Sequence, residues 1–189
     1  MLLAASNLAC SRKSRALFAP VTLALNAGSL TLLTGPNGSG KTSLLRALAG
    51  LLPYEGALEK NADVILIGHA GGIQPDLTVR EHLSFWQGIA RQRSVVFFSD
   101  ILHLAGLGEL EDTLAATLST GQKQRLALCR LLLEDAPVWL LDEPSSALDA
   151  QGQAFLSKLL AKHTAHGGAA LIASHLPLHG ANTLALEAA

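Results

Sequence analysis

Eight consecutive residues near the start of the chain have the types and spacing of a phosphate-binding loop. They follow the pattern Gly-x-x-x-x-Gly-Lys-Thr and are Gly35, Pro36, Asn37, Gly38, Ser39, Gly40, Lys41 and Thr42. Glycines let backbone N–H groups converge on phosphate oxygens, and a following helix adds partial positive charge at its start. We expect Lys41 to reach the β- and γ-phosphates and Thr42 to ligate Mg²⁺, and we include Ser43 in the nucleotide-binding set. The pattern predicts a site for a nucleoside triphosphate.

Two neighbouring carboxylates, Asp142 and Glu143, are the second group that could take part in phosphate chemistry. Apolar residues precede the pair and Pro144 follows it, so a plain acidic surface is the weaker interpretation. Asp142 would end a buried strand, at the edge where ligands of parallel sheets collect, and could hold Mg²⁺ there through water. Glu143 is placed to orient or deprotonate an attacking water, because phosphoryl transfer mainly needs positioning and charge neutralisation.

Strand and helix patterns alternate around these residues, as in an α/β fold. Residues 30–33 form a short apolar strand before the loop, and leucines recurring from Leu44 to Leu52 mark one face of a helix behind it. Other strands are expected at 2–10 and 21–25, as an antiparallel pair, and at 63–67, 138–141 and 169–173, as buried core strands. We read 51–56 as a turn, and 169–173 as the last clear core strand.

A segment of helical pattern, at about residues 78–120, separates two of the predicted core strands. It follows a glycine-rich loop at 68–76, and Thr78 with Glu81 has the spacing of a capping box at a helix start. Apolar residues at positions 79, 83, 86 and 89 mark one face of that helix. We therefore expect one domain over residues 1–189, with an antiparallel β subdomain at its amino end and an inserted α-helical subdomain.

The composition limits which partners to expect. Of the 189 residues 49% are hydrophobic and the mean hydropathy is +0.34, but no apolar run approaches the ~18 residues of a membrane span. Such a composition is typical of a domain partly covered by a partner, although alanine and leucine content alone could also produce it. With a net charge of −1, no basic block and 4% aromatic residues, binding of nucleic acid is not expected.

The two cysteines, Cys10 and Cys129, are far apart and lack the spacing of metal ligands. We read both as free thiols in a reducing compartment. Residues 8–10 end an apolar stretch much as a lipoprotein signal does, but no positive segment precedes them, and Ser6 and Asn7 interrupt the stretch. The expected location is therefore cytoplasmic.

An ordered set of motifs resembles the nucleotide-binding subunits of ABC transporters. The phosphate loop alone would also fit kinases, GTPases and other ATPases. The motifs that narrow the choice are the signature Leu118-Ser119-Thr120-Gly121-Gln122, then Asp142-Glu143-Pro144, Leu148-Asp149 and Ser174-His175. The resemblance covers nearly the whole chain, and it implies a P-loop NTPase fold of the ABC ATPase type with a RecA-like core.

The resemblance also implies roles that the patterns alone leave open. In this family the signature of one subunit contacts the γ-phosphate of the ATP that is bound to Lys41 of the other subunit. Two ATP molecules therefore lie between two copies. One copy has one phosphate loop and one signature, which predicts a homodimer or a closely related heterodimer. Asp149, in the D-loop, would lie near the same interface. His175 would join Lys41 and Glu143 in the catalytic set as a hydrogen-bond donor.

Three positions depart from the common pattern of that family. Thr120 replaces a glycine of the signature, a mild change because a hydroxyl fits there. In the family, a glutamine in the loop after the 63–67 strand usually contacts Mg²⁺. By spacing from Leu77 and Thr78, that position falls on His69 or a neighbour in this chain, and Gln74 follows some residues later. An aromatic residue that usually covers adenine is missing, and Arg12, in the polar tip 11–15, is the candidate replacement because a guanidinium can stack on a ring. A solvated hairpin turn is the plainer interpretation of that tip.

Within the family, the sequence is similar to the ATPases of cytochrome c maturation. The residues that carry this likeness are Ile67-Gly68-His69, Leu77-Thr78, 118–128, 139–144 and 174–178. The likeness implies an ATPase, peripheral to the cytoplasmic face of the bacterial inner membrane, whose partners are integral membrane permease subunits of a haem-handling complex. ATP hydrolysis would drive haem export or the release of a haem-loaded chaperone.

Other functions fit the same catalytic residues. The chain could be the ATPase subunit of another small ABC exporter. A soluble ABC ATPase that acts on DNA or ribosomes is disfavoured by the single cassette and the absence of basic blocks. A small-molecule kinase with a phosphate loop would leave the signature helix without a purpose.

Overall fold

The computed structural model describes residues 1–12, 15–69, 71–90 and 97–188, and for Arg12 it describes the backbone alone. The chain forms two compact units. The first consists of Met1–Leu66, Pro137–Glu143 and Leu160–Ala189, and the second of Ile67–Ala136 and Pro144–Leu159. Both units therefore combine segments that are distant in the sequence.

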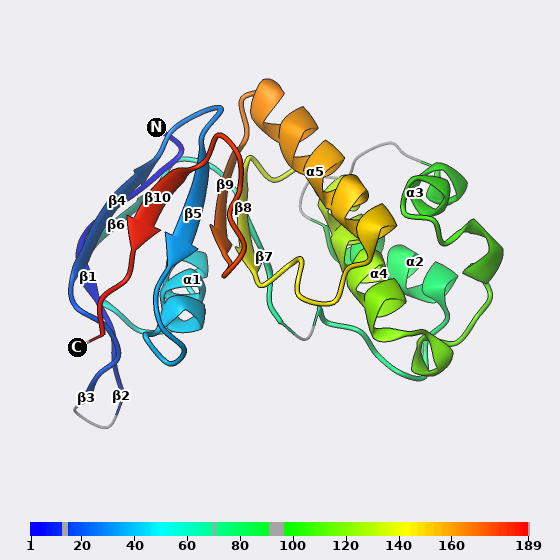
Figure 1. The fold of residues 1–189 in the computed structure, drawn as a ribbon, viewed down its shortest axis with the longest axis horizontal. Helices are drawn as coiled ribbons and strands as arrows, with labels where there is room; N and C mark the ends of the chain where they lie inside the picture. Colours follow the sequence, from blue (N-terminus) through cyan, green and yellow to red (C-terminus); the bar gives the residue numbers. More distant parts are fainter. Residues whose placement is uncertain (13–14, 70, 91–96, 189) are drawn as a thin grey trace. The chain divides into compact units, whose positions relative to one another are not determined.

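Two sheets and helix α1 form the frame of the first unit (Figure 1). An antiparallel sheet has the order β4-β1-β6, with β1 at Leu3–Ala9, β4 at Val21–Leu25 and β6 at Glu55–Lys60. A second sheet has the order β10-β5-β9-β8-β7, with β5 at Leu30–Thr34, β7 at Val64–Ile67, β8 at Val138–Asp142, β9 at Ala169–Ala173 and β10 at Asn182–Ala185. Helix α1, Lys41–Ala49, packs against β8.

Continuous apolar runs place the middle strands of the second sheet in the core. Every residue of β8 and of β9 is buried, as expected for parallel strands covered on both faces. The leucines of α1, including Leu44 and Leu48, join the same apolar cluster as Leu33 of β5 and Leu140 of β8. Because β5, β8 and β9 are parallel, their carboxyl ends share one edge, and the segments that leave this edge carry the phosphate loop, Glu143 and His175.

Helices make up most of the second unit. They are α2 at Val79–Ile89, α3 at Phe98–Leu104, two 3₁₀ turns at Gly108–Leu110 and Ala115–Thr117, and α4 at Thr120–Leu133. Helices α2 and α3 both pack on α4. Helix α5, Ala150–Ala165, begins in this unit and ends in the first. No helix in the described part of the chain has the length and apolar character to span a membrane.

Most predicted elements are confirmed, and the exceptions have physical reasons. Strand β6 begins at Glu55, inside the predicted turn, and sequence patterns miss it because this sheet-edge strand is mostly exposed and carries charged residues. Strand β10 follows β9 and pairs with β5 at the edge of the sheet (Figure 1). It is mostly exposed, so sequence patterns miss it, and 169–173 is still the last buried strand of the sheet. Ile89 is 56% exposed, because at 3.6 residues per turn it points about 80° away from Val79.

Candidate nucleotide-binding site

The phosphate loop joins β5 to α1, and its helix start carries no side-chain cap. Gly40 is the N-cap residue of α1, and no side chain accepts a hydrogen bond there. The first N–H groups of an α-helix have no partner within the helix, and they favour an anion together with the helix dipole. The start of α1 thus has the arrangement that a phosphate group requires.

At two positions of the loop, close contacts leave no room for a side chain and so require glycine. A Cβ on Gly40, whose φ is +95°, would lie 2.8 Å from the Leu17 carbonyl oxygen. A Cβ on Gly35, whose φ is +153°, would lie 2.7 Å from the Leu186 carbonyl oxygen. The loop is therefore enclosed by the segment that precedes β4 and by the segment that follows β10.

Lys41 is held against its own loop. Its side chain is almost buried, and Nζ donates to the carbonyl oxygens of Gly35 at 2.7 Å and Pro36 at 3.0 Å. Both acceptors are uncharged, so these two bonds do not neutralise the charge of the ammonium group. A buried cation of this kind is strongly stabilised by a phosphate.

Thr42 and Asp142 meet at the end of β8. The Thr42 hydroxyl donates to Asp142 Oδ2 at 2.7 Å, and Asp142 is 5% exposed. A hydroxyl and a carboxylate are the hard oxygen ligands that Mg²⁺ accepts, usually with water and substrate phosphates. Among the described residues, no cluster of three or more His, Cys, Asp or Glu side chains could hold a metal on its own. The residues present fit Mg²⁺ that arrives with a nucleotide.

Glu143 and His175 lie beside each other. His175 Nε2 is 3.0 Å from Asn37 Oδ1 and 3.5 Å from Glu143 Oε1. Because Asn37 Oδ1 can only accept, Nε2 carries the proton, and His175 is a donor at this position. Glu143 has a φ of +51°, and its N–H donates to the Ala173 carbonyl oxygen. Left-handed backbone at a residue other than glycine is uncommon, and it concentrates at functional positions.

A single cavity of about 320 Å³ gathers these side chains. Its lining comprises Leu17, Asn37, Gly38, Gly40, Lys41, Thr42, Ser43, Asp142, Glu143 and His175. Leu17 is a residue that the sequence analysis missed. The signal was present as the apolar run Ala16-Leu17-Phe18-Ala19 between the polar tip and β4, in which Phe18 is fully buried.

The side chain of Arg12 lies outside the described residues. Its backbone belongs to β2, Ser11–Arg12, which pairs antiparallel with β3, Arg15–Ala16, as the hairpin interpretation of the tip expects. The stacking of Arg12 on adenine stays a prediction.

In the second unit, two signature residues, Ser119 and Gln122, are hydrogen-bonded to each other. Ser119 is the N-cap of α4, its Oγ accepts from Gln122 N at 3.2 Å, and Gln122 Oε1 accepts from Ser119 N at 2.8 Å. This is a complete capping box. A Cβ on Gly121 would lie 2.9 Å from the Ala147 carbonyl oxygen, so the connector after Pro144 runs close to the signature.

Two neighbouring residues of α4 hold both ends of that connector. Gln124 Nε2 donates to the Pro144 carbonyl oxygen at 3.1 Å, and the Arg125 guanidinium donates to Gln151 Oε1 at 3.1 Å. Between them, Asp149 Oδ1 accepts from Gly152 N at 2.8 Å near the start of α5. The signature helix and the D-loop are thus connected within one unit, and the Asp149 carboxylate stabilises a helix start.

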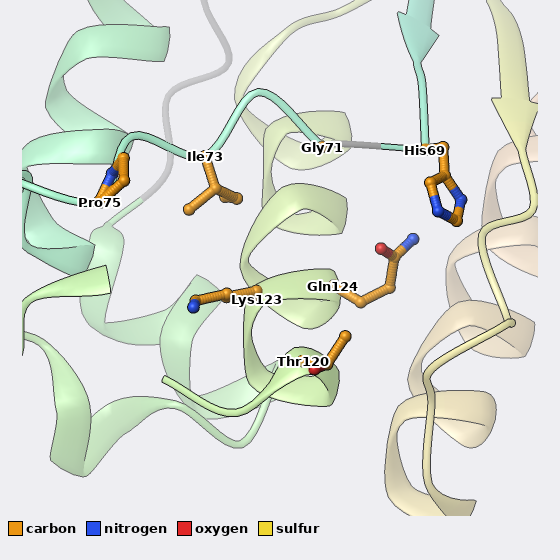
Figure 2. A pocket seen from close by; sticks show the side chains of 7 residues that line it. All are labelled: His69, Gly71, Ile73, Pro75, Thr120, Lys123 and Gln124. Carbon is orange, nitrogen blue, oxygen red and sulfur yellow. The ribbon is translucent and has the colours of Figure 1, made fainter. Parts of the chain in front are cut away.

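The loop after β7 and helix α4 line a second cavity, of about 240 Å³. The loop contributes His69, Gly71, Ile73 and Pro75, and α4 contributes Thr120, Lys123 and Gln124 (Figure 2). The His69 ring and the Gln124 amide extend toward each other in this view. His69 therefore lines this cavity, whereas Gln74 is tied to α2 through its backbone N–H, which donates to His82 Nε2 at 2.9 Å.

Burial and hydrogen bonding shift the pKa values of two thiols and one carboxyl group. Burial raises the pKa of the Cys10 thiol, and it raises the pKa of Cys129 to about 12, although the charge of Arg125 opposes that shift. Both cysteines are free and buried, so neither is an activated nucleophile. Hydrogen bonds from Thr78 lower the pKa of Glu81, as expected for the confirmed capping box at the start of α2.

Comparison with known proteins gives consistent results. A family model described as ABC transporter matches residues 18–146. The chain is 41% identical to the cytochrome c biogenesis ATP-binding export protein CcmA of Nitrobacter hamburgensis, over 94% of each chain. It is 41% identical to CcmA of Haemophilus influenzae, over 92% of this chain and 88% of that one. It is 44% identical to CcmA of Paracoccus denitrificans, over 94% and 84%.

Solved structures establish the fold. An ABC transporter ATP-binding protein from Pyrococcus furiosus superposes with a TM-score of 0.82 at 20% identity, over 97% of this chain and 96% of that one. An ATP-binding subunit of another ABC transporter gives the same TM-score at 22% identity, over 93% and 80%. The predicted ABC ATPase fold and the predicted family resemblance are confirmed.

Proposed function

We propose that this chain, which belongs to the ABC transporter family and within it to the CcmA cytochrome c biogenesis ATP-binding proteins, is the ATP-hydrolysing subunit of a haem export complex. The observation that carries the proposal is the cavity at the carboxyl edge of the parallel sheet. It brings together a buried cation, a hydroxyl–carboxylate pair and a second carboxylate beside a histidine donor. The reaction is ATP + H₂O to ADP + phosphate.

Each side chain has one task in this reaction. Lys41 leaves its loop carbonyls for the β- and γ-phosphates, and the open start of α1 holds the phosphate chain. Mg²⁺, which Thr42 and Asp142 would hold, supplies positive charge for the triphosphate. Glu143 accepts the proton of the attacking water, and His175 donates a hydrogen bond to the γ-phosphate.

The adenine and metal contacts extend the proposal to three further side chains. Arg12 would stack on adenine, and Leu17, which lines the cavity, would add an apolar contact. His69 or Gln74 would supply the additional Mg²⁺ contact. Replacing Arg12 with alanine should weaken adenine recognition. Equal discrimination between ATP and GTP in Arg12→Ala and the parent would leave residues 11–15 as a plain hairpin.

The assembly follows from the number of motifs. One chain carries one phosphate loop and one signature, so two copies would enclose two ATP molecules, with each signature on the γ-phosphate of the other copy. The partners would be integral membrane permease subunits, and the ATPase would lie as a peripheral protein on the cytoplasmic face of the bacterial inner membrane. The loop after β7 and the helices of the second unit would dock on them.

Replacing Glu143 with glutamine tests the catalytic assignment. Glu143→Gln should bind ATP like the parent and lose on the order of 10²-fold or more in hydrolysis rate, because the general base is removed. Glu134→Gln, which alters a carboxylate on the second unit, is the matched control and should hydrolyse ATP normally. Hydrolysis by Glu143→Gln at the parental rate would exclude Glu143 as the base.

A capture experiment tests the cellular role. Tagged Glu143→Gln protein is incubated with detergent-solubilised membranes, with and without Mg-ATP, and the bound proteins and their haem absorbance are measured. Polytopic partners together with a haem-bearing protein support the proposal. Polytopic partners without haem indicate another small ABC exporter, and no membrane partner favours a soluble ABC ATPase.

A further inference from the structure

His82 is a buried polar residue of the second unit that the proposed reaction does not use. It lies in the first turn of α2 and is 1% exposed. Its Nε2 lies 2.9 Å from the backbone nitrogen of Gln74, and its Nδ1 lies 2.8 Å from the carbonyl oxygen of Thr78. The Trp86 ring packs beside it, with centroids 5.3 Å apart and planes at 58°. Both ring nitrogens are therefore committed to main-chain atoms.

These two contacts define the protonation state of the ring. A backbone N–H can only donate and a carbonyl oxygen can only accept, so Nε2 must be bare and Nδ1 must carry the proton. A proton on Nε2 would place two donors face to face and break the bond to Gln74. The arrangement thus requires the neutral ring with its proton on Nδ1.

The bond to Gln74 holds a loop that several other contacts also fix. A Cβ on Gly71 would lie 2.7 Å from Ala127 Cβ, so the loop touches α4 at its start. Farther on, the N–H groups of Ala116 and Ala115 donate to the carbonyl oxygens of Pro75 at 3.0 Å and Leu77 at 2.9 Å. The loop is therefore tied to α4, to α2 and to the residues that lead into the signature.

Gln74 sits between two residues that line the cavity against α4. Ile73 and Pro75 form part of the loop wall, and Thr120 and Lys123 form part of the opposite wall (Figure 2). The described bonds of Gln74 N and Pro75 O hold adjacent positions of that wall. Loss of the His82 bond would release the loop at Gln74, between its contact with α4 at Gly71 and its bonds at Pro75 and Leu77.

We propose that His82 is a positioning residue that fixes the loop 73–77 against the signature helix for ATP hydrolysis. The proposal rests on the proposed function, because the loop is assigned to Mg²⁺ and partner contact there. His82 itself contacts no nucleotide in the proposed reaction. It acts through the Gln74 backbone, as its neutral ring with the proton on Nδ1.

The first test is spectroscopic and uses the unaltered protein. Long-range ¹H–¹⁵N spectra of the His82 ring should show a protonated Nδ1 and a bare Nε2, and the Gln74 amide should exchange slowly with solvent. A proton on Nε2, or rapid exchange of the Gln74 amide, overturns the proposal whatever the activity of the protein.

The second test separates positioning from packing. His82→Phe keeps a ring beside Trp86 but removes both hydrogen bonds, whereas His82→Asn and His82→Gln keep a neutral donor and acceptor. We expect His82→Phe to lose on the order of tenfold in kcat, with KM for ATP little changed and faster exchange at Gln74. At least one amide variant should recover much of the kcat. His103→Asn, at an exposed histidine of α3, is the control.

The outcomes distinguish this proposal from the proposed function. Parental kcat in His82→Phe, with hydrolysis stalled in Glu143→Gln, overturns the role of His82 alone. An amide variant as slow as His82→Phe overturns the hydrogen-bond explanation. If the purified protein, reconstituted with its membrane partners, hydrolyses no ATP, the proposed function fails, and the role of His82 in hydrolysis fails with it.

Discussion

The helix that follows the phosphate loop and the helix that follows the signature start in opposite ways. Helix α1 begins after Gly40, with no side chain at its cap. Helix α4 begins after Ser119, which exchanges two hydrogen bonds with Gln122, and α2 has an equivalent box between Thr78 and Glu81. An uncapped start leaves its first N–H groups to a ligand, whereas a capping box satisfies two N–H groups at the start from within the chain. Helix α1 therefore depends on an anion at its start, whereas the start of α4 is held by its own side chains before any phosphate of a second copy arrives.

The same contrast extends to the side chains around each start. In the first unit, Lys41 rests on loop carbonyls and Thr42 rests on Asp142, contacts that a nucleotide with Mg²⁺ could replace. In the second unit, His82 and Gln124 bind main-chain atoms, contacts that fix loops in place. The first unit therefore offers exchangeable polar groups, and the second offers a preformed frame.

The largest expected effect comes from removing the charge at the open helix start. Lys41→Ala should lower ATP affinity by on the order of 10²-fold or more, because the phosphates lose a nearly buried cation. Titration calorimetry with Mg-ATP measures the effect. Lys158→Ala, at an exposed lysine of α5, should bind ATP like the parent. Equal losses in the two variants would contradict a specific role for Lys41.

A methyl group at the same helix start should have the next largest effect. Gly40→Ala forces a side chain into left-handed backbone and to 2.8 Å from the Leu17 carbonyl oxygen, which should cost about 1–3 kcal/mol of unfolding free energy. Gly38→Ala is the matched control, since its φ is +80° but nothing lies within 4 Å of the new Cβ. Urea denaturation should rank Gly40→Ala as the less stable variant, and the reverse order would show that contact with Leu17 is unimportant.

Local patterns predicted the phosphate loop and the carboxylate pair, because each motif is continuous in the sequence and follows an apolar strand, whereas the role of His175 was predicted from the family resemblance. The phosphate loop after β5 and the carboxylates after β8 are of this kind. The sequence did not reveal Leu17, the strand β10 or the role of His82. Each of these depends on a partner elsewhere in the chain or on an atom of the backbone, such as the Gln74 N–H. Periodicity carries no information about such contacts.

Ser119→Ala should have a moderate effect, and it tests whether the capped start is mainly structural. Loss of the hydroxyl removes the acceptor for Gln122 N and should lower the unfolding free energy by about 1 kcal/mol. Thr120→Ala, one residue farther along, is the control and should change stability little. If Ser119→Ala is as stable as the parent but fails to hydrolyse ATP, the hydroxyl serves the nucleotide and not the helix.

The two cysteines report on the two units separately and should give the smallest effect. Because burial raises both pKa values, the folded thiols stay protonated at pH 8 and should react slowly with iodoacetamide, and both should react in urea. Since the unfolded thiols ionise first, stability should fall as the pH rises above about 8.5, and Cys129→Ala should reduce that slope.

The reaction rates of the two thiols, measured with and without Mg-ATP, also test whether the nucleotide stabilises the first unit more than the second. Cys10 lies in the first unit, where its carbonyl oxygen accepts from the N–H of Leu17 in the wall of the nucleotide cavity, whereas Cys129 lies in α4. A bound ligand slows the local unfolding events that would release it. Mg-ATP should therefore slow the reaction of Cys10 with iodoacetamide more than that of Cys129, by roughly tenfold. Lys41→Ala should abolish the difference. Equal protection of both thiols in the parent would mean that the two units open together, and that the contrast between an exchangeable site and a fixed frame does not extend to their dynamics.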